Sequence, residues 1–298
     1  MSNETYRETN FRPDSLARIV RINEILSEYD QKLTARQVYY QFVSRGWLEN
    51  TERSYKGLTS LLTDARYAGL VDWEAIEDRG REPAIPLEFR DLAHRVESAI
   101  ENYRLDRWEG QENYVELWVE KQALAGVLAP LARKFHVTLM VNKGYSSASA
   151  MKDAAERIRF AYNDAVDAGQ AKMPIILYLG DHDPSGEDMV RDIEDRLNEF
   201  LAGDTVEVEV RELALTMAQI RKFNPPPNPA KVTDSRAAAY IAKYGPQSWE
   251  LDALPPRELN RIVERAFAGV LDLDKYNAVI KREEADKAKL RKAAGGVK

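Results

Sequence analysis

The 298-residue sequence contains no cysteine, so a disulfide framework, a thiolate zinc site and a cysteine nucleophile are all excluded. It also lacks any apolar run near the roughly 18 residues that a membrane-spanning helix requires. Its polar start, MSNETYRETN, has no apolar centre of the secretory-signal type. No glycine-rich phosphate-binding loop of the NTPase kind is present. These absences predict a cytoplasmic protein with no membrane partner and no ATPase activity of its own.

Positive charge is concentrated in two segments of a chain whose net charge is -6. Residues 31–66 contain six basic and three acidic side chains, and residues 276–298 contain seven basic and three acidic ones. Locally basic segments suit phosphate binding, although a solvated surface of mixed charge would give the same pattern. We expect the basic tail, 276–298, to be a frayed helix or disordered.

The first 110 residues are predicted to form a helical domain. A helix begins near Pro13, a second runs from the capping residue Thr34 to Gly46, and a third spans about 52–68. Residues 70–73 (LVDW) are typical of a short strand. Three helices and a strand are the components of a winged helix-turn-helix, with a plain helical domain as the alternative. In the winged-helix interpretation, the third helix faces DNA with Arg53, Lys56 and Arg66.

Residues 111–275 alternate between strand and helix patterns. The run PIILYL at 174–179 is continuously apolar, as in a strand buried on both faces. Alternation of this kind predicts an α/β domain with a parallel sheet of four strands flanked by helices. The expected strands are 115–119, 137–141, 174–179 and 206–210, and the expected helices are 122–135, 147–168 and 183–201.

Three carboxylates follow two of these strands. Glu120 ends the first predicted strand, and Asp181 and Asp183 follow the third in the loop GDHDPSG. Because ligands bind at the carboxyl ends of parallel strands, these side chains are expected to share one edge of the sheet. Carboxylates are the ligands that Mg²⁺ prefers, so the sequence predicts a magnesium site. A helix cap plus a surface charge is the alternative for the aspartates. His182 is expected to be packed rather than to bind metal.

These residues carry a family resemblance. The loop at 180–186 and the glutamate motif at 119–121 resemble the Toprim domain of topoisomerases, primases and related nucleases. Residues 142–145 (NKGY) and 250–254 (ELDAL) resemble two further motifs of a narrower group. That group is the A subunit of topoisomerase VI together with the meiotic double-strand-break transesterase. The motifs occur in the family's order and cover roughly residues 30–260.

The resemblance extends to the N-terminal domain. The family carries a motif Arg-Asp-x-Tyr-Tyr, whose second tyrosine attacks the DNA phosphate, and residues 36–40 read RQVYY here. It therefore implies that Tyr40 is the nucleophile, Arg36 a phosphate-binding partner and Glu120 a further catalytic residue. Gln37 replaces the family's acidic residue. A spacing of four places Arg36 and Tyr40 on one helix face. Lys143 is expected to contact DNA.

The resemblance implies a Mg²⁺-dependent transesterase that cleaves double-stranded DNA through a 5′-phosphotyrosyl intermediate, with possible religation. It further implies a homodimer in which the tyrosine of one subunit meets the metal site of the other, so the two need not be close within one chain. Strand passage would require a separate ATPase subunit, and the protein would be associated with the nucleoid. The compact chain is similar to stand-alone A-like proteins of mobile elements. A Toprim endonuclease that hydrolyses DNA with an activated water, and a non-catalytic DNA-binding module, are the alternatives.

Overall fold

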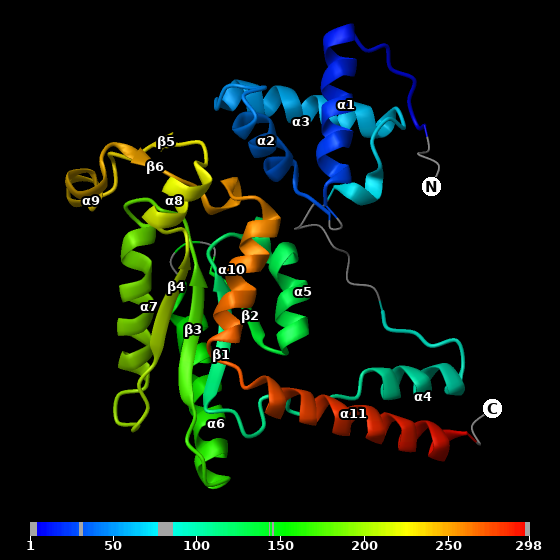
Figure 1. Ribbon diagram of the computed structural model, residues 1–298, viewed down its shortest axis with the longest axis vertical. Coiled ribbons are helices and arrows are strands. Elements are labelled where there is room, and N and C mark those ends of the chain that lie inside the picture. The colour runs from blue at the N-terminus through cyan, green and yellow to red at the C-terminus, as the bar shows by residue number, and fades with distance from the viewer. Residues whose placement is uncertain (1–4, 30–31, 77–85, 143, 145, 296–298) are drawn as a thin grey trace.

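The computed structural model describes residues 5–29, 32–76, 86–142, 144 and 146–295. Its N-terminal region contains three helices, α1 (Pro13–Ser27), α2 (Ala35–Ser44) and α3 (Glu52–Tyr67), as the sequence predicts (Figure 1). Thr34 caps α2 in a reciprocal arrangement with Gln37. The three helices enclose an apolar core of their own, in which Ile22, Phe42 and Leu58 are buried.

The strand predicted at 70–73 is wrong. The chain makes a turn there and continues into a 3₁₀ helix at Trp73–Ala75, whose start is capped by the Asp72 carboxylate. Val71 is buried in the core, but it pairs with no other strand. Within residues 5–29 and 32–76, the β-structure consists of one isolated bridge between Leu33 and Ile76. The three helices are therefore confirmed, whereas the winged helix-turn-helix is not.

A parallel sheet of four strands forms the centre of the remaining chain. Its order is β2 (Thr138–Val141), β1 (Asn113–Val119), β3 (Met173–Leu179) and β4 (Glu209–Ala214). All three neighbouring pairs are parallel, which confirms the α/β prediction. The fourth strand begins at Glu209, three residues later than predicted. The preceding Val206 and Val208 are buried in the core beneath the helices on one side of the sheet.

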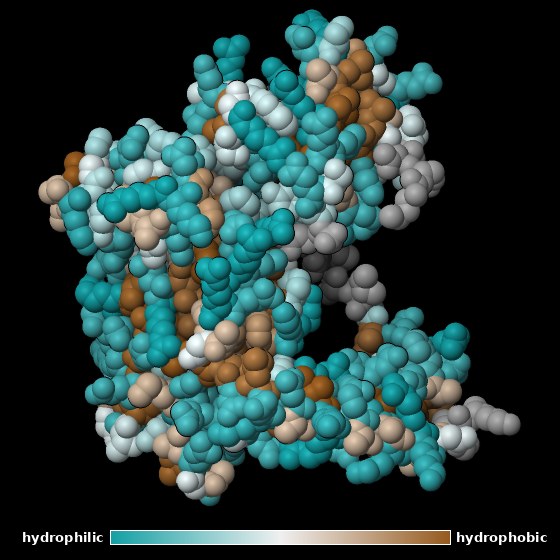
Figure 2. Space-filling view, viewed as in Figure 1, coloured by the Kyte–Doolittle hydropathy of each residue, from teal (hydrophilic) through white to brown (hydrophobic). Residues whose placement is uncertain are grey.

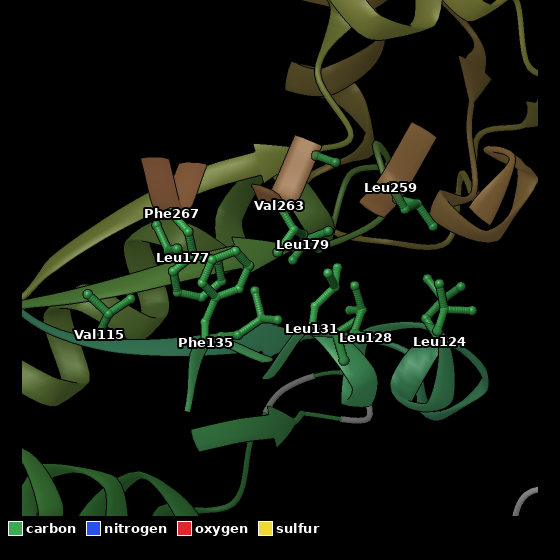
Figure 3. Packing of buried hydrophobic residues seen from close by; sticks show 14 of the residues in the cluster. Val115, Leu124, Leu128, Leu131, Phe135, Leu177, Leu179, Leu259, Val263 and Phe267 are labelled. Atoms are coloured by element: carbon green, nitrogen blue, oxygen red, sulfur yellow. The ribbon is translucent and has the colours of Figure 1, made fainter. Parts of the chain in front are cut away.

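Helices cover both faces of the sheet. Successive residues of β1 point to opposite faces, so Leu117 joins one core and Trp118 the other. The first core lies beneath α5 (Ala125–Phe135) and α10 (Pro256–Ala268), where the rings of Phe135 and Phe267 stack with their centroids 4.2 Å apart (Figure 3). The second lies beneath α6 (Ala148–Asp167) and α7 (Gly186–Phe200).

Between β4 and α10 the chain crosses the carboxyl edge of the sheet. This stretch holds α8 (Met217–Phe223), a two-stranded antiparallel pair of β5 (Asn228–Pro229) and β6 (Gln247–Ser248), α9 (Ala237–Tyr244) and the 3₁₀ turn η3 (Leu251–Ala253). The turn packs against α2, and Ala253 enters the N-terminal core. The stretch therefore joins the N-terminal helices to the strand ends.

The last helix does not form a frayed or disordered tail over its described length. Helix α11 (Leu273–Ala294) is continuous, and it buries Glu283 and Lys287. It packs against α4 (Leu92–Glu101), and the pair projects from the sheet domain (Figure 1). Figure 2 shows a mostly hydrophilic face with an open space between this pair and the N-terminal helices. None of the described helices combines the length and the apolar character that a membrane crossing requires.

Candidate active site

Glu120 and Asp181 meet at the carboxyl edge of the sheet. Glu120 directly follows β1, and Asp181 is the second residue after β3. The backbone N–H of Asp181 donates to Glu120 Oε2 over 2.9 Å. The Gly180 N–H donates to the Ala214 carbonyl of the neighbouring strand, which fixes the start of the loop. The sheet topology thus brings together two of the three predicted metal ligands.

Asp183 lies further along the same loop and holds the start of α7. Its Oδ1 accepts hydrogen bonds from the backbone N–H of Ser185 (2.9 Å), the Ser185 hydroxyl (2.7 Å) and the backbone N–H of Gly186 (2.7 Å). A Cβ on Gly186 would lie 1.9 Å from the Asp181 carbonyl oxygen, so only glycine fits there. Helix α7 accordingly begins at Gly186 rather than at the predicted residue 183. Asp183 acts as a helix cap through one of its two carboxylate oxygens.

Lys121 connects three carboxylates. Its Nζ lies 3.0 Å from Asp181 Oδ2, 2.8 Å from Glu250 Oε2 and 3.0 Å from Asp252 Oδ1. The second oxygen of Asp181, Oδ1, accepts from the Leu251 N–H over 2.8 Å. Both oxygens of Asp181 are therefore engaged by the chain itself.

Negative charge is in excess at this edge of the sheet. Burial raises the pKa of Asp181 to about 7, an effect that Lys121 opposes and Glu120 reinforces. Burial and the charge of Asp183 likewise raise the pKa of Glu120, against the hydrogen bond from the Asp181 backbone. A bound cation would relieve this repulsion, so the donor set suits a hard divalent ion. In the part of the chain that the structure describes, however, no three such groups converge on one point.

That lack of convergence has a local cause. Asp183 Oδ1 is turned to the first N–H groups of α7, and Asp181 is held by Lys121 and Leu251. The predicted magnesium ligands Glu120, Asp181 and Asp183 are therefore not arranged around one point, and a cation at Asp181 would lie beside the Lys121 ammonium.

The predicted tyrosine and arginine face the same region of the molecule. A cleft of about 340 Å³ is lined by Arg36 and Tyr40 of α2 and by Asp181 and Asp183 of the loop after β3. Its remaining lining includes Asn50, Tyr55, Asn228, Lys231 and Glu250. Tyr40 and Arg36, which need not be close to the metal site within one chain, therefore share a cleft with Asp181 and Asp183, whereas Glu120 is not among the residues that line it.

Arg36 is held by two acidic residues of the crossing stretch. Its Nη1 lies 3.5 Å from Glu250 Oε2, and its Nε lies 4.0 Å from Asp252 Oδ2. Its guanidinium also lies over the ring of Tyr55, 5.6 Å from the centroid. Gln37, which stands where the related motif has an acidic residue, is occupied in capping α2. The carboxylates that orient Arg36 thus come from residues 250 and 252 instead.

Tyr40 is 3% exposed and belongs to the N-terminal core. Burial raises the pKa of its phenol, and the charges of Asp252 and Glu250 raise it further, while Asn228 and Arg36 act in the opposite direction. The phenol is therefore protonated at neutral pH. Its neighbour Tyr39 is packed as well, and donates to the Glu49 and Thr51 carbonyls or to Asn50 Oδ1.

The predicted DNA-contacting residues differ in their surroundings. Arg53 is exposed near the start of α3, and Lys56 pairs with Glu52 over 2.7 Å on the same exposed face. Arg66 instead lies over the ring of Trp73, 4.2 Å from its centroid, and is partly buried. Lys143 falls outside the described residues.

His182 is buried between the two aspartates of the loop, as predicted for a packed residue. Its Nδ1 lies 2.8 Å from the Tyr240 hydroxyl, and Nε2 lies 3.3 Å from Glu187 Oε1. The backbone of His182 exchanges two hydrogen bonds with Trp249. The histidine therefore anchors the loop to the crossing stretch.

Sequence reasoning assigned no role to Lys121, Glu250 or Asp252, although each stood inside a motif that carried the resemblance. What could have pointed to them is that each is a charged residue within one of these motifs. Comparison with protein-family models, curated proteins and solved structures found no match to this chain.

Proposed function

We propose that this protein is a Mg²⁺-dependent DNA-cleaving transesterase of the topoisomerase VI A-subunit type, with Tyr40 as the nucleophile. The observation that supports it is the shared cleft, in which Tyr40 and Arg36 face the loop of Asp181 and Asp183. A tyrosine beside an arginine and a group of carboxylates is the set of side chains that phosphodiester transesterification uses.

Each residue has a defined part in the reaction. Arg36 binds the scissile phosphate with its guanidinium, and Glu250 and Asp252 hold it in position. The Tyr40 hydroxyl passes its proton to the Glu250 carboxylate, with which it is hydrogen-bonded, and attacks phosphorus. The bond from phosphorus to O3′ breaks, O3′ takes up a proton, and the tyrosine is left on the 5′-phosphate. Reversal of the same step gives religation. Glu120, Asp181 and Asp183 would hold Mg²⁺, which would supply positive charge near the phosphate and the leaving oxygen.

Cleavage of both strands of a duplex requires two such clefts. We therefore include a homodimer acting on double-stranded DNA, at the nucleoid, in the proposal. Strand passage driven by ATP would be assigned to a separate ATPase subunit.

The test is a covalent-adduct assay with supercoiled plasmid and Mg²⁺, followed by protease treatment to release trapped DNA. Wild type should give protein-linked 5′ ends, and Tyr40→Phe should give none. Tyr39→Phe is the matched control, because it removes a phenol from the same helix outside the proposed chemistry. Adducts that persist in Tyr40→Phe would exclude this tyrosine as the nucleophile.

Hydrolysis by an activated water is the second candidate. The burial of Tyr40 and the raised pKa of its phenol favour it, because a covered, protonated phenol is a poor nucleophile. The same carboxylates would then act without Tyr40. Cleaved plasmid with protein-free ends in both wild type and Tyr40→Phe would support this nuclease.

A further inference from the structure

Lys121 occupies a central position in the candidate site. An ammonium group has three N–H donors, and here three carboxylates lie within 3.0 Å of Nζ, those of Asp181, Glu250 and Asp252. They come from two parts of the chain, Asp181 from the loop after β3 and Glu250 and Asp252 from either side of Leu251.

The same lysine connects the two halves of the cleft. Asp181 belongs to the predicted metal ligands, whereas Glu250 and Asp252 hold Arg36 beside Tyr40. Lys121 and Arg36 thus contact the same two carboxylates: both lie near Glu250 Oε2, and they face different oxygens of Asp252. Within the described residues, Asp252 Oδ2 has no hydrogen-bond donor although it is buried, and Arg36 Nε is 4.0 Å away.

Lys121 also stands where a cation would act on Asp181. Of the two oxygens of Asp181, Oδ1 is fixed by the Leu251 N–H and Oδ2 by the ammonium. Each carboxylate oxygen can accept from two directions, so a divalent ion at Oδ2 would lie beside the ammonium, whose positive charge opposes it. If the ion displaced the ammonium, Lys121 would keep Glu250 and Asp252 as partners.

We propose that Lys121 is a positioning residue that holds Asp181 in the cation-free cleft, competes with Mg²⁺ for its Oδ2, and couples the metal half to Arg36. This inference rests on the proposed function only in taking Asp181 as a metal ligand. Loss of the lysine therefore increases cation affinity, because a competitor and a neighbouring positive charge both disappear. A lysine with a purely structural role would have the opposite effect or none.

The experiment measures Mn²⁺ binding by the full chain from the electron paramagnetic resonance signal of free Mn²⁺. Lys121→Met alone leaves buried carboxylates without a partner, which strongly destabilises a protein. The main variant is therefore Lys121→Met combined with Asp252→Asn, which removes one charge of each sign. Asp252→Asn alone is the matched control, Lys134→Met controls for loss of an exposed lysine, and Asp181→Asn identifies binding at this site.

We expect the double variant to bind Mn²⁺ roughly tenfold or more tightly than Asp252→Asn, since a unit charge a few ångströms from the ion is removed. Lys134→Met should bind like wild type, and Asp181→Asn should lose the site. Equal or weaker binding by the double variant would overturn the proposal, as would an absence of Asp181-dependent binding in every variant. The adduct assay decides the proposed reaction separately, so tighter Mn²⁺ binding without adducts would retain this inference and reject the transesterase.

Discussion

Glu283 of α11 offers a quantitative test of how the C-terminal helix is held. Its carboxylate is fully buried and receives Arg107 Nη2 at 2.9 Å, Lys287 Nζ at 3.0 Å and the Leu105 N–H at 3.2 Å. Burial by itself would raise the pKa of Glu283, but Arg107, Lys287 and the Leu105 N–H together lower it from 4.5 to about 2. The perturbation we choose is Glu283→Gln.

The expected loss of stability follows from the lowered pKa of Glu283. A difference of about 2.5 pKa units corresponds to about 3 kcal/mol at 1.36 kcal/mol per unit. Because the folded-state pKa is lowered, this stabilisation is fully present above pH 4.5 and is lost as the pH falls through about 2. We therefore expect Glu283→Gln to lower the free energy of unfolding by about 3 kcal/mol at pH 7, and by roughly half as much at pH 3.

The free energies of unfolding of wild type and Glu283→Gln are measured by urea denaturation at pH 7 and pH 3, monitored by circular dichroism. Glu284→Gln is the matched control, because Glu284 is the next residue, is 59% exposed and pairs only with Lys287 among the ion pairs of the described residues. Its effect should stay below about 1 kcal/mol. A Glu283→Gln deficit below about 1 kcal/mol at pH 7, or one that does not shrink at pH 3, would refute the reasoning.

Two further predictions concern the loop after β3. Gly186→Ala should destabilise the fold by roughly 1–3 kcal/mol and abolish Asp181-dependent Mn²⁺ binding, because the added Cβ would lie 1.9 Å from the Asp181 carbonyl oxygen. Thermal melting measures the first effect and the Mn²⁺ resonance titration the second. An unchanged melting temperature or unchanged Mn²⁺ binding would contradict the prediction. Asp183→Asn should change the free energy of unfolding by less than about 1 kcal/mol, since asparagine caps helices as well as aspartate does. It should nevertheless lose adduct formation with plasmid and Mg²⁺, and adducts at the wild-type level would remove Asp183 from the proposed metal site.

The parallel sheet was predictable because its central strands carry a strong local signal. The run at 174–179 is apolar at every position, and it forms β3 with both faces covered. The segment at 70–73 is apolar at three of its four positions, but it is short, and the side chain of Asp72 caps the 3₁₀ turn that begins there. Helix α11 was misjudged because its composition is that of a solvated tail. Arg107, which pairs with the buried Glu283, lies 176 residues earlier in the chain.

The candidate site was predictable to the extent that topology determines it. The rule that strand ends share one edge is sufficient to bring Glu120 to Asp181. The network of Lys121, Glu250 and Asp252 was not predictable, because Lys121 and Glu250 are separated by 129 residues and meet only through the crossing stretch. Gln37 shows the same limit: it stands where the related motif has an acidic residue, and the carboxylates near Arg36 come instead from Glu250 and Asp252 of a later motif.

The size of the cleft determines what can reach Tyr40. A volume of about 340 Å³ is that of a small-ligand pocket. A DNA duplex is much larger, since its major groove alone is about 12 Å wide. Only a short piece of one backbone strand fits unless the N-terminal helices move away from the crossing stretch. Beside the cleft, Asn50 Nδ2 joins these parts by donating to the Pro227 carbonyl at 3.1 Å and to Asn228 Oδ1 at 2.8 Å. At a net ~1 kcal/mol for each hydrogen bond, breaking these two costs about 2 kcal/mol. The packing of η3 on α2 and the ion pairs of Arg36 with Glu250 and Asp252 join the same parts, so contacts with DNA would have to offset all of these to widen the entrance.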